Sequence, residues 1–184
     1  EPAYAPVIQS ASGWVADNRG YIVTAAHIAR DITYGATVRD LQGQEYPARI
    51  VAVAADRELA LLQTEFPMDG APAVFAPSHG PRPGDPVFAV GAPDGRPGVV
   101  AAGRVMDPEF TEDVRYGRYG MPRAIRLAVN ISPGYSGGPL FDRHGRLVGM
   151  VAGFLIAPDG TGRGVGFAIP ADDIREWLAR TISN

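Results

Sequence analysis

A serine between glycines in the second half of the chain has the surroundings that nucleophilic chemistry needs. Ser136 lies in residues 131–140, ISPGYSGGPL. A serine hydroxyl is a weak nucleophile until a base removes its proton and nearby donors hold the resulting oxyanion. Glycine has no Cβ and lets the backbone approach a substrate closely. The N–H groups of Gly134 and Ser136 can point at one spot, which predicts an oxyanion hole; an ordinary surface turn is the alternative.

A base and an acid are available earlier in the chain. His27 ends an apolar segment that begins at residue 21, and a histidine at the end of a buried strand can place its ring in a cleft. Residues 56–62, DRELALL, put acidic side chains just before a second apolar run. A lone histidine is more often a core residue, but a histidine, an acid and a serine in this order indicate activation of the serine by a base.

Several segments resemble the trypsin-like serine peptidases and, within them, the HtrA/Deg-type bacterial branch. Residues 24–27, TAAH, are similar to the histidine motif of that family, and residues 134–139, GYSGGP, are similar to its serine motif. Residues 12–15, SGWV, and 164–170, GVGFAIP, resemble further landmarks of the branch. The resemblance implies a serine endopeptidase that cleaves extended or unfolded polypeptide through an acyl-enzyme, with His27 as the base.

The acid position departs from the family pattern. Glu58 stands where the family has aspartate, immediately before the apolar run. Glutamate is one methylene longer and can still accept a hydrogen bond from imidazole, so we expect Glu58 to orient His27. Asp56 is the alternative acid, because it would lie on the same side of an extended strand. A degraded triad would instead make the chain a non-catalytic binding or scaffold protein, and an esterase is a further alternative.

The resemblance also places a specificity pocket. Its floor and walls are expected at Asn130, Ile131, Ala152, Gly153, Phe154 and Val165. No acid lies at this floor, so a basic P1 side chain would stay unpaired in a buried site. Phe154 and Val165 stand where many relatives have glycine, which predicts a shallow pocket for small or medium aliphatic P1 residues. Ala152 and Gly153 can offer a strand edge to an extended peptide.

The resemblance bears on activation as well. Tyr135 stands where trypsin-like proteases that mature by N-terminal cleavage carry an acid, so that mode of activation is not expected. Relatives of the HtrA type depend on loop ordering instead. The candidates for such a switch are residues 132–133 and residues 107–123, a polar segment that we interpret as a mobile loop near the cleft.

Short antiparallel strands are expected to position these residues. The 184-residue chain has 23 glycines and 17 prolines without low-complexity runs, which favours short strands and tight turns. The first half has apolar runs at residues 7–15, 21–27, 36–41, 46–54 and 59–64. The second half has them at residues 87–91, 99–106, 124–130, 139–141, 147–156 and 165–169. With the resemblance, this predicts an all-β, trypsin-like fold of two six-stranded antiparallel barrels, with the active site between them and a C-terminal helix.

We expect a single peptidase domain over residues 1–184. Its parts are a barrel over about 7–66, a linker over about 67–86, a second barrel over about 87–170 and a helix over about 172–182. Asp172 or Asp173 can cap the helix N-terminus. Relatives of the HtrA type usually carry PDZ domains after such a helix, so this chain is expected to be trimmed or to belong to a branch without them.

Composition excludes several functions. The net charge of −3 gives no electrostatic case for nucleic-acid binding. No apolar run approaches the ~20 residues that a membrane span needs. His79 and His144 lie in turn-like contexts without metal-ligand spacing, so we expect neither a metal nor a cofactor. The chain begins at Glu1, so we expect a processed or trimmed product from which any signal peptide has been removed. The resemblance implies a bacterial periplasmic or secreted protein, a polypeptide substrate and a possible homo-oligomer.

Overall fold

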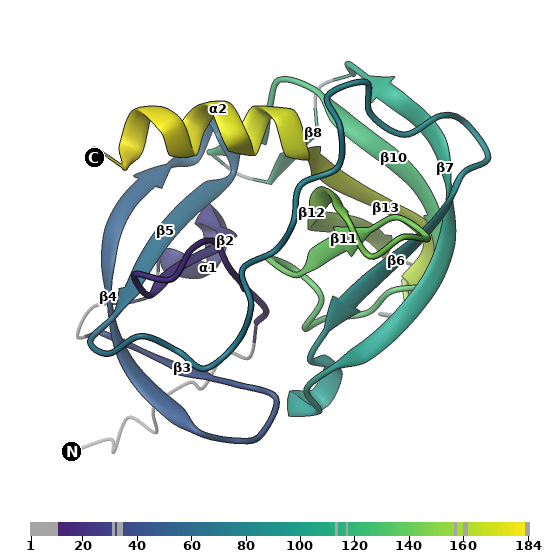
Figure 1. Ribbon diagram of the computed structural model, residues 1–184. Coiled ribbons are helices and arrows are strands. Elements are labelled where there is room, and N and C mark those ends of the chain that lie inside the picture. Colours follow the sequence, from purple (N-terminus) through teal and green to yellow (C-terminus); the bar gives the residue numbers. More distant parts are fainter. Residues whose placement is uncertain are drawn as a thin grey trace.

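Two antiparallel sheets lie side by side, with the C-terminal helix across one end of the pair (Figure 1). The computed structural model describes residues 11–30, 32, 35–112, 114–116, 118–156, 158–159 and 162–182. The expected all-β, trypsin-like class with a C-terminal helix is confirmed. Tight turns join several of the strands, as the glycine and proline content predicts, but β4, β7 and β12 are longer than expected, with 10, 12 and 10 residues.

The first sheet places the ends of two strands together. Its five described strands run in the order β1-β2-β5-β4-β3. They are β1 (Trp14–Val15), β2 (Tyr21–Ala25), β3 (Ala36–Arg39), β4 (Glu45–Ala54) and β5 (Leu59–Thr64). Because β2 and β5 are antiparallel, with Ala25 opposite Leu59, the residue after β2 lies beside the residue before β5. The strand predicted over residues 7–15 lies partly outside the described residues, and its described end contains β1.

The second sheet is a closed six-stranded barrel in the order β10-β13-β12-β11-β6-β7. Its strands are β6 (Pro86–Gly91), β7 (Val99–Phe110), β10 (Ala124–Val129), β11 (Pro139–Phe141), β12 (Leu147–Ile156) and β13 (Gly162–Pro170). Alternate apolar residues such as Ile125, Leu127 and Val151 are fully buried inside it. The second six-stranded barrel is therefore confirmed, whereas the described strands of the first half form an open five-stranded sheet and not the predicted six-stranded barrel. A separate core cluster, with Leu61, Met150 and Phe167, joins the two sheets.

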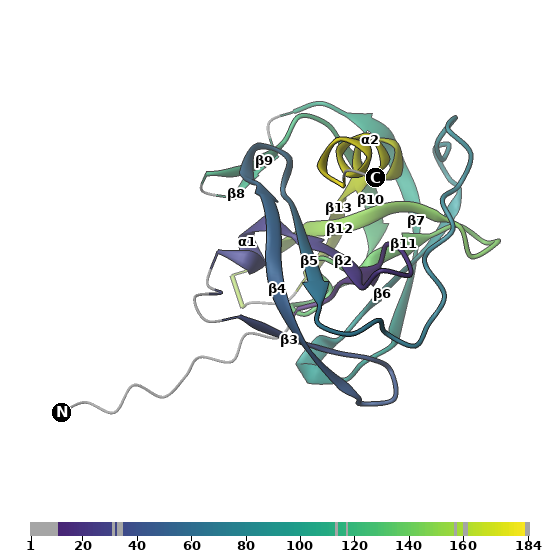
Figure 2. The same cartoon turned by 60° about the vertical axis from the view of Figure 1, so that its left-hand side comes forward.

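The segment at residues 107–123 differs from its prediction as a mobile loop. β7 continues to Phe110, and β8 (Val114–Tyr116) and β9 (Tyr119–Met121) form a hairpin. Figure 2 shows this hairpin on the same side of the molecule as α1 (Ala26–Ala29). Tyr119 and Met121 are buried, and that burial supports the hairpin although the segment is polar overall. The prediction of a loop was wrong for most of the segment.

Three short elements and one longer helix complete the fold. The short ones are α1 and two 3₁₀ turns, η1 (Ala55–Arg57) and η2 (Pro93–Gly95). The longer helix, α2 (Ala171–Thr181), buries Ile174 and Trp177 and agrees with its prediction within one residue. Its N-cap is Pro170, without a side-chain cap, so the predicted capping by Asp172 or Asp173 was wrong. No helix in the described part of the chain has the length and apolar character of a membrane span.

Candidate active site

A histidine and a glutamate from the first sheet form the centre of the site. Nδ1 of His27 lies 2.7 Å from Oε1 of Glu58. The same oxygen accepts the backbone N–H of His27 at 2.8 Å, and the Glu58 carbonyl accepts the N–H of Ala26 at 3.1 Å. Glu58 is only 2% exposed. A carboxylate on Nδ1 fixes the ring orientation and keeps the proton on that nitrogen, which leaves Nε2 as the basic atom.

The backbone of Glu58 explains which acid reaches the histidine. Residues 55–57 form a 3₁₀ turn, and Glu58 follows it in the left-handed region with φ 56° and ψ 29°. This conformation is uncommon for a residue with a side chain. Asp56 was expected on the same side of an extended strand, but it lies exposed in the turn instead. The structure brings Glu58 to His27 and leaves Asp56 outside the site.

The loop with Ser136 connects β10 to β11 in the second barrel. Gly134 and Gly137 have φ values of 105° and 85°, which favour glycine. The turn is held by the N–H of Gly137 on the carbonyl of Val151 at 2.7 Å. Tyr135 is buried against Gly91, where an added Cβ would overlap its ring. Burial raises the pKa of the Tyr135 phenol, so this side chain stays neutral and anchors the loop.

Two backbone donors of this loop are available to a ligand. Within the described residues, the N–H groups of Gly134 and Ser136 donate to no protein acceptor. Among the described residues, Ser136 Oγ and His27 form no hydrogen bond with each other. This contact is often long in enzymes without a bound substrate. Ser136 is only partly buried, so a substrate carbonyl can approach it. This arrangement is suited to holding an oxyanion.

An aromatic residue that the sequence did not indicate lies beside the histidine. The ring of Tyr119 meets the ring of His27 edge to face, with centroids 6.4 Å apart. Tyr119 is 2% exposed, and the guanidinium of Arg118 lies over its ring. The β8–β9 hairpin therefore contacts His27 through Tyr119, on the same side of the molecule as α1 (Figure 2). The repeat RYGRYG was the only available signal, and it does not reveal which tyrosine is buried.

The residues predicted to form the specificity pocket divide between two faces. Phe154 lies opposite Gly166 in the β12–β13 pair and packs with the interior of the second barrel. An added Cβ on Gly166 would lie 3.0 Å from Ile131, so Ile131 borders the same place. Val165 packs instead with the core between the sheets. The structure brings Phe154 and Ile131 together but not Val165.

The remaining predicted positions lie around these two residues. Asn130 precedes Ile131 and is exposed. Gly162 approaches the carbonyl of Ile131 so closely that it has no room for a side chain. Ala152 is buried and Gly153 is half-buried, next to a bulge in the β12–β13 pair. Of these positions, Phe154, Ile131 and Ala152 are apolar and Asn130 is polar.

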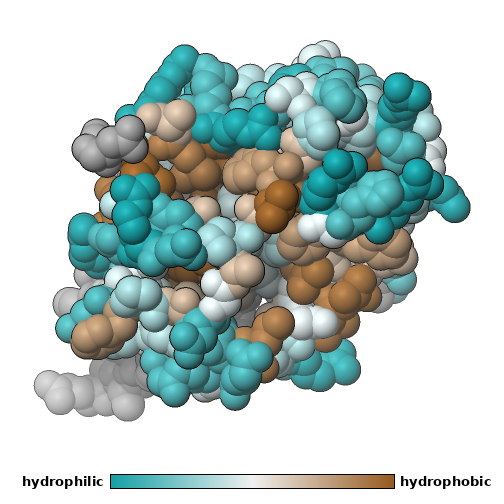
Figure 3. Space-filling view, viewed as in Figure 1, coloured by the Kyte–Doolittle hydropathy of each residue, from teal (hydrophilic) through white to brown (hydrophobic). Residues whose placement is uncertain are grey.

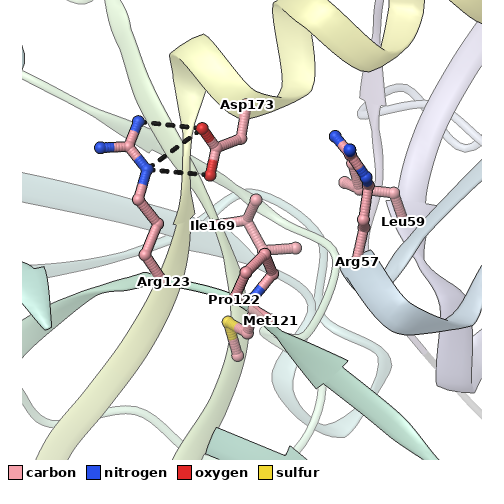
Figure 4. A pocket seen from close by; sticks show the side chains of 7 residues that line it. All are labelled: Arg57, Leu59, Met121, Pro122, Arg123, Ile169 and Asp173. Carbon is pink, nitrogen blue, oxygen red and sulfur yellow. Dashed lines mark hydrogen bonds and ion pairs between the residues drawn. The ribbon is translucent and has the colours of Figure 1, made fainter. Parts of the chain in front are cut away.

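A small pocket lies behind the turn that carries Glu58 (Figure 4). It is lined by Arg57, Leu59, Met121, Pro122, Arg123, Ile169 and Asp173. Arg123 donates from Nε and Nη2 to Asp173, and these hydrogen bonds raise the pKa of its guanidinium. The free volume of about 10 Å³ is at the limit for one water molecule. The pocket is therefore too small for a substrate.

Hydrophilic side chains lie mainly at the periphery of the face shown in Figure 3, and apolar groups lie across its middle. Large exposed apolar side chains in the described chain include Leu41, Phe66, Val74 and Val100. Single exposed apolar residues are common on folded proteins and do not define a binding surface.

Comparisons with known sequences identify the family. The family model for the trypsin-like peptidase domain matches residues 11–150. The chain is 34% identical over 171 residues to a probable periplasmic serine endoprotease, DegP-like, of Bartonella henselae, covering 93% of this chain and 33% of that protein. It is 30% identical over 177 residues to the periplasmic serine endoprotease DegP of Escherichia coli K12, covering 93% of this chain and 35% of that protein.

Solved structures give the same result. The HtrA-type protease AlgW with a decapeptide superimposes with a TM-score of 0.80 at 26% identity, covering 93% of this chain and 51% of that one. AlgW with a tripeptide gives a TM-score of 0.78 at 27% identity, covering 92% of this chain and 54% of that one. The chain thus spans about a third of the length of the curated relatives and about half of these structures.

Proposed function

Because the chain belongs to the trypsin-like peptidase family, we propose that it is a serine endopeptidase that acts through an acyl-enzyme. Ser136 Oγ attacks the scissile carbonyl while His27 takes its proton and later returns it to the leaving amine. Glu58 holds the imidazole and stabilises the imidazolium that forms. The observation that carries this proposal is the 2.7 Å contact between Nδ1 of His27 and the buried carboxylate of Glu58.

The backbone of the serine loop supplies the second part of the mechanism. Attack by Ser136 places negative charge on the former carbonyl oxygen of the substrate. The N–H groups of Gly134 and Ser136, which have no acceptor in the described protein, are proposed to bind that oxygen. Donors that are fixed before the reaction stabilise the charge without reorganisation, and this is usually the largest contribution to such catalysis.

The substrate is proposed to be an extended or unfolded polypeptide with a small or medium aliphatic P1 residue. Phe154 and Ile131 lie at the place proposed for this side chain, where Phe154 is half-buried and Ile131 is buried. Within the described residues that border it, no carboxylate is present to pair with a basic side chain. The edge of β12 near Gly153 is proposed to pair with the substrate backbone.

The rival function, a binding protein with a degraded triad, is not favoured. Its only support was the glutamate in place of aspartate, and Glu58 reaches His27 with a normal hydrogen-bond distance. The relatives are named periplasmic endoproteases, which supports a location in the bacterial periplasm or outside the cell. A homo-oligomer remains a prediction.

The function is tested by incubating the purified chain with a permanently unfolded polypeptide and identifying the cut sites by mass spectrometry. We expect cleavage after Ala, Val or Leu, and no cleavage by Ser136→Ala. Cleavage that persists in Ser136→Ala at the wild-type rate would contradict the proposal. The same peptides in a compact, folded host should be cut far more slowly.

A further inference from the structure

Ser12 makes four hydrogen bonds to segments far apart in the sequence. Its backbone N–H donates to the carbonyl of Ser136 at 3.0 Å, and its Oγ donates to the carbonyl of Gly134 at 2.6 Å. The same Oγ accepts the N–H of Ala92 at 3.1 Å, and the carbonyl of Ser12 accepts Oγ1 of Thr24 at 2.8 Å. One small residue therefore joins β2, the serine loop and the segment after β6.

The serine loop packs directly on this residue. An added Cβ on Gly137 would overlap both the carbonyl oxygen of Ser12 and Oγ1 of Thr24. An added Cβ on Gly138 would lie 3.3 Å from Cβ of Ser12. The contact between Ser12 and the loop is thus close along several residues and leaves little freedom for the loop to move away.

We propose that Ser12 is a positioning residue that holds the oxyanion donors in their working geometry. This inference rests on the proposed function. The two carbonyls that Ser12 binds belong to Gly134 and Ser136, the same residues whose N–H groups are proposed to bind the oxyanion. Gly134 has φ 105° and no side chain, so its backbone can adopt many conformations. A contact from another segment is needed to hold it in a single conformation.

Ser12 also relates the nucleophile to the base. Thr24, which binds the Ser12 carbonyl, lies on β2 three residues before His27. His27 comes from the first sheet and Ser136 from the second barrel, so their relative position depends on contacts between the two. One hydrogen bond joins Thr24 to Ser12 and another joins Ser12 to Ser136, so these three residues connect the two sheets.

The test compares two substitutions of nearly equal shape. Ser12→Thr keeps the hydroxyl and Ser12→Val removes it, while both add the same bulk, so a steric cost affects both variants equally. Ser12→Ala removes the hydroxyl without added bulk. Ser78→Ala is the matched control, because Ser78 is exposed in the connection between the sheets and its hydroxyl binds Arg175. For each variant, kcat, KM, the thermal midpoint and the amide exchange rate of Ala92 are measured.

We expect kcat of Ser12→Ala to fall by about 10- to 100-fold, the range that a misplacement near 1 Å produces, with KM changed less than about twofold. Ser12→Thr should keep more activity than Ser12→Val, and Ser78→Ala should match the wild type. The Ala92 N–H also donates to the Gly134 carbonyl at 3.2 Å, so losing the Ser12 hydroxyl should remove one of its two acceptors. Exchange of the Ala92 amide should therefore accelerate in part in Ser12→Ala and Ser12→Val, and not in Ser12→Thr or Ser78→Ala. Amide exchange does not depend on catalysis. It therefore shows whether Ser12 fixes the neighbouring segments even if the wild type cleaves no peptide.

Two results would overturn the inference. One is a Ser12→Ala variant with wild-type kcat and unchanged Ala92 exchange. The other is a loss of activity that Ser12→Thr and Ser12→Val share equally and that their loss of thermal stability accounts for. An inactive wild type would count against the proposed function alone, because the exchange measurement would still show whether Ser12 holds the loop.

Discussion

One carboxylate oxygen of Glu58 accepts two hydrogen bonds from His27, from Nδ1 at 2.7 Å and from the backbone N–H at 2.8 Å. The acid therefore fixes both the ring and the start of α1 that carries it. The additional methylene of glutamate is accommodated by the left-handed backbone of Glu58, which follows the 3₁₀ turn. These contacts support the proposal that a glutamate at this position can serve as the acid of the triad.

The first prediction concerns the acid. Glu58→Gln keeps the shape but removes the charge and favours the wrong imidazole tautomer, so kcat should fall by about 10³- to 10⁴-fold with the fold intact. Asp56→Asn is the matched control and should stay within about twofold of the wild type, because Asp56 is exposed. Peptide hydrolysis checks both, and the opposite ranking of these variants would identify Asp56 as the acid.

The second prediction concerns P1 preference. Phe154→Ala enlarges the place that Phe154 and Ile131 border, so the kcat/KM ratio for Phe over Ala at P1 should rise by about 10-fold or more. Val165→Ala removes a side chain from the other face of the same strand pair and should leave this ratio unchanged. A peptide series that varies only P1 measures the ratio. An equal change in both variants would place the P1 site elsewhere.

The third prediction compares two glycines in the left-handed region, Gly137 with φ 85° and Gly145 with φ 73°. Gly145 has open space around it, so Gly145→Ala should lose only about 1–2 kcal/mol of unfolding free energy through backbone strain. Gly137→Ala adds an overlap with Ser12 and Thr24 and should lose more, together with all activity. Urea unfolding and peptide hydrolysis measure both effects, and equal stability losses would refute the close packing.

The fourth prediction concerns pH and the hairpin between β11 and β12. Partial burial would raise the pKa of Asp142, but hydrogen bonds from the Arg146 and His144 backbone and the Arg146 side chain outweigh it and lower the pKa. A lowered pKa contributes stability above the unfolded value of about 3.9, and this is lost as pH falls through the folded value. Asp142→Asn should therefore destabilise by about 1 kcal/mol at pH 7, and the difference should shrink toward pH 3.

The control for this effect is Glu112→Gln, which neutralises an exposed carboxylate on another part of the surface. Its unfolding free energy should stay near that of the wild type at both pH values. A difference between Asp142→Asn and the wild type that grows as the pH is lowered would contradict the direction of the pKa shift.

The sequence predicts the parts of the site that local motifs encode. Ser136 and His27 lie in short segments whose residue types and order indicate their chemistry, and the strands of the second barrel follow apolar runs. The sequence favoured Glu58 but left Asp56 open as the alternative, because the position of each carboxylate depends on a 3₁₀ turn and a positive φ that no local pattern indicated. The prediction of an extended backbone at Asp56 was wrong, because residues 55–57 form a 3₁₀ turn.

Long-range packing accounts for the other differences. Residues 107–123 are polar and contain glycines, so they resemble a loop, but β9 packs beside η1 and buries Tyr119. Val165 and Phe154 are both apolar, and only the register of β12 and β13, with its bulges, places them on opposite faces. The sequence around Ser12 indicates a family landmark but not the contacts that Ser12 makes. These contacts could not be predicted, because the four partners are distant in the sequence and most of them are backbone atoms.

The central claim is that His27, Glu58 and Ser136 form a working triad, and covalent labelling tests it most directly. The purified chain is treated with a fluorophosphonate, and the modified residue is identified by intact mass and peptide mapping. We predict stoichiometric labelling of Ser136, abolished by Ser136→Ala and by His27→Ala while both variants remain folded. A folded wild-type chain that stays unlabelled between pH 6 and 9, or is labelled equally in His27→Ala, would contradict the claim.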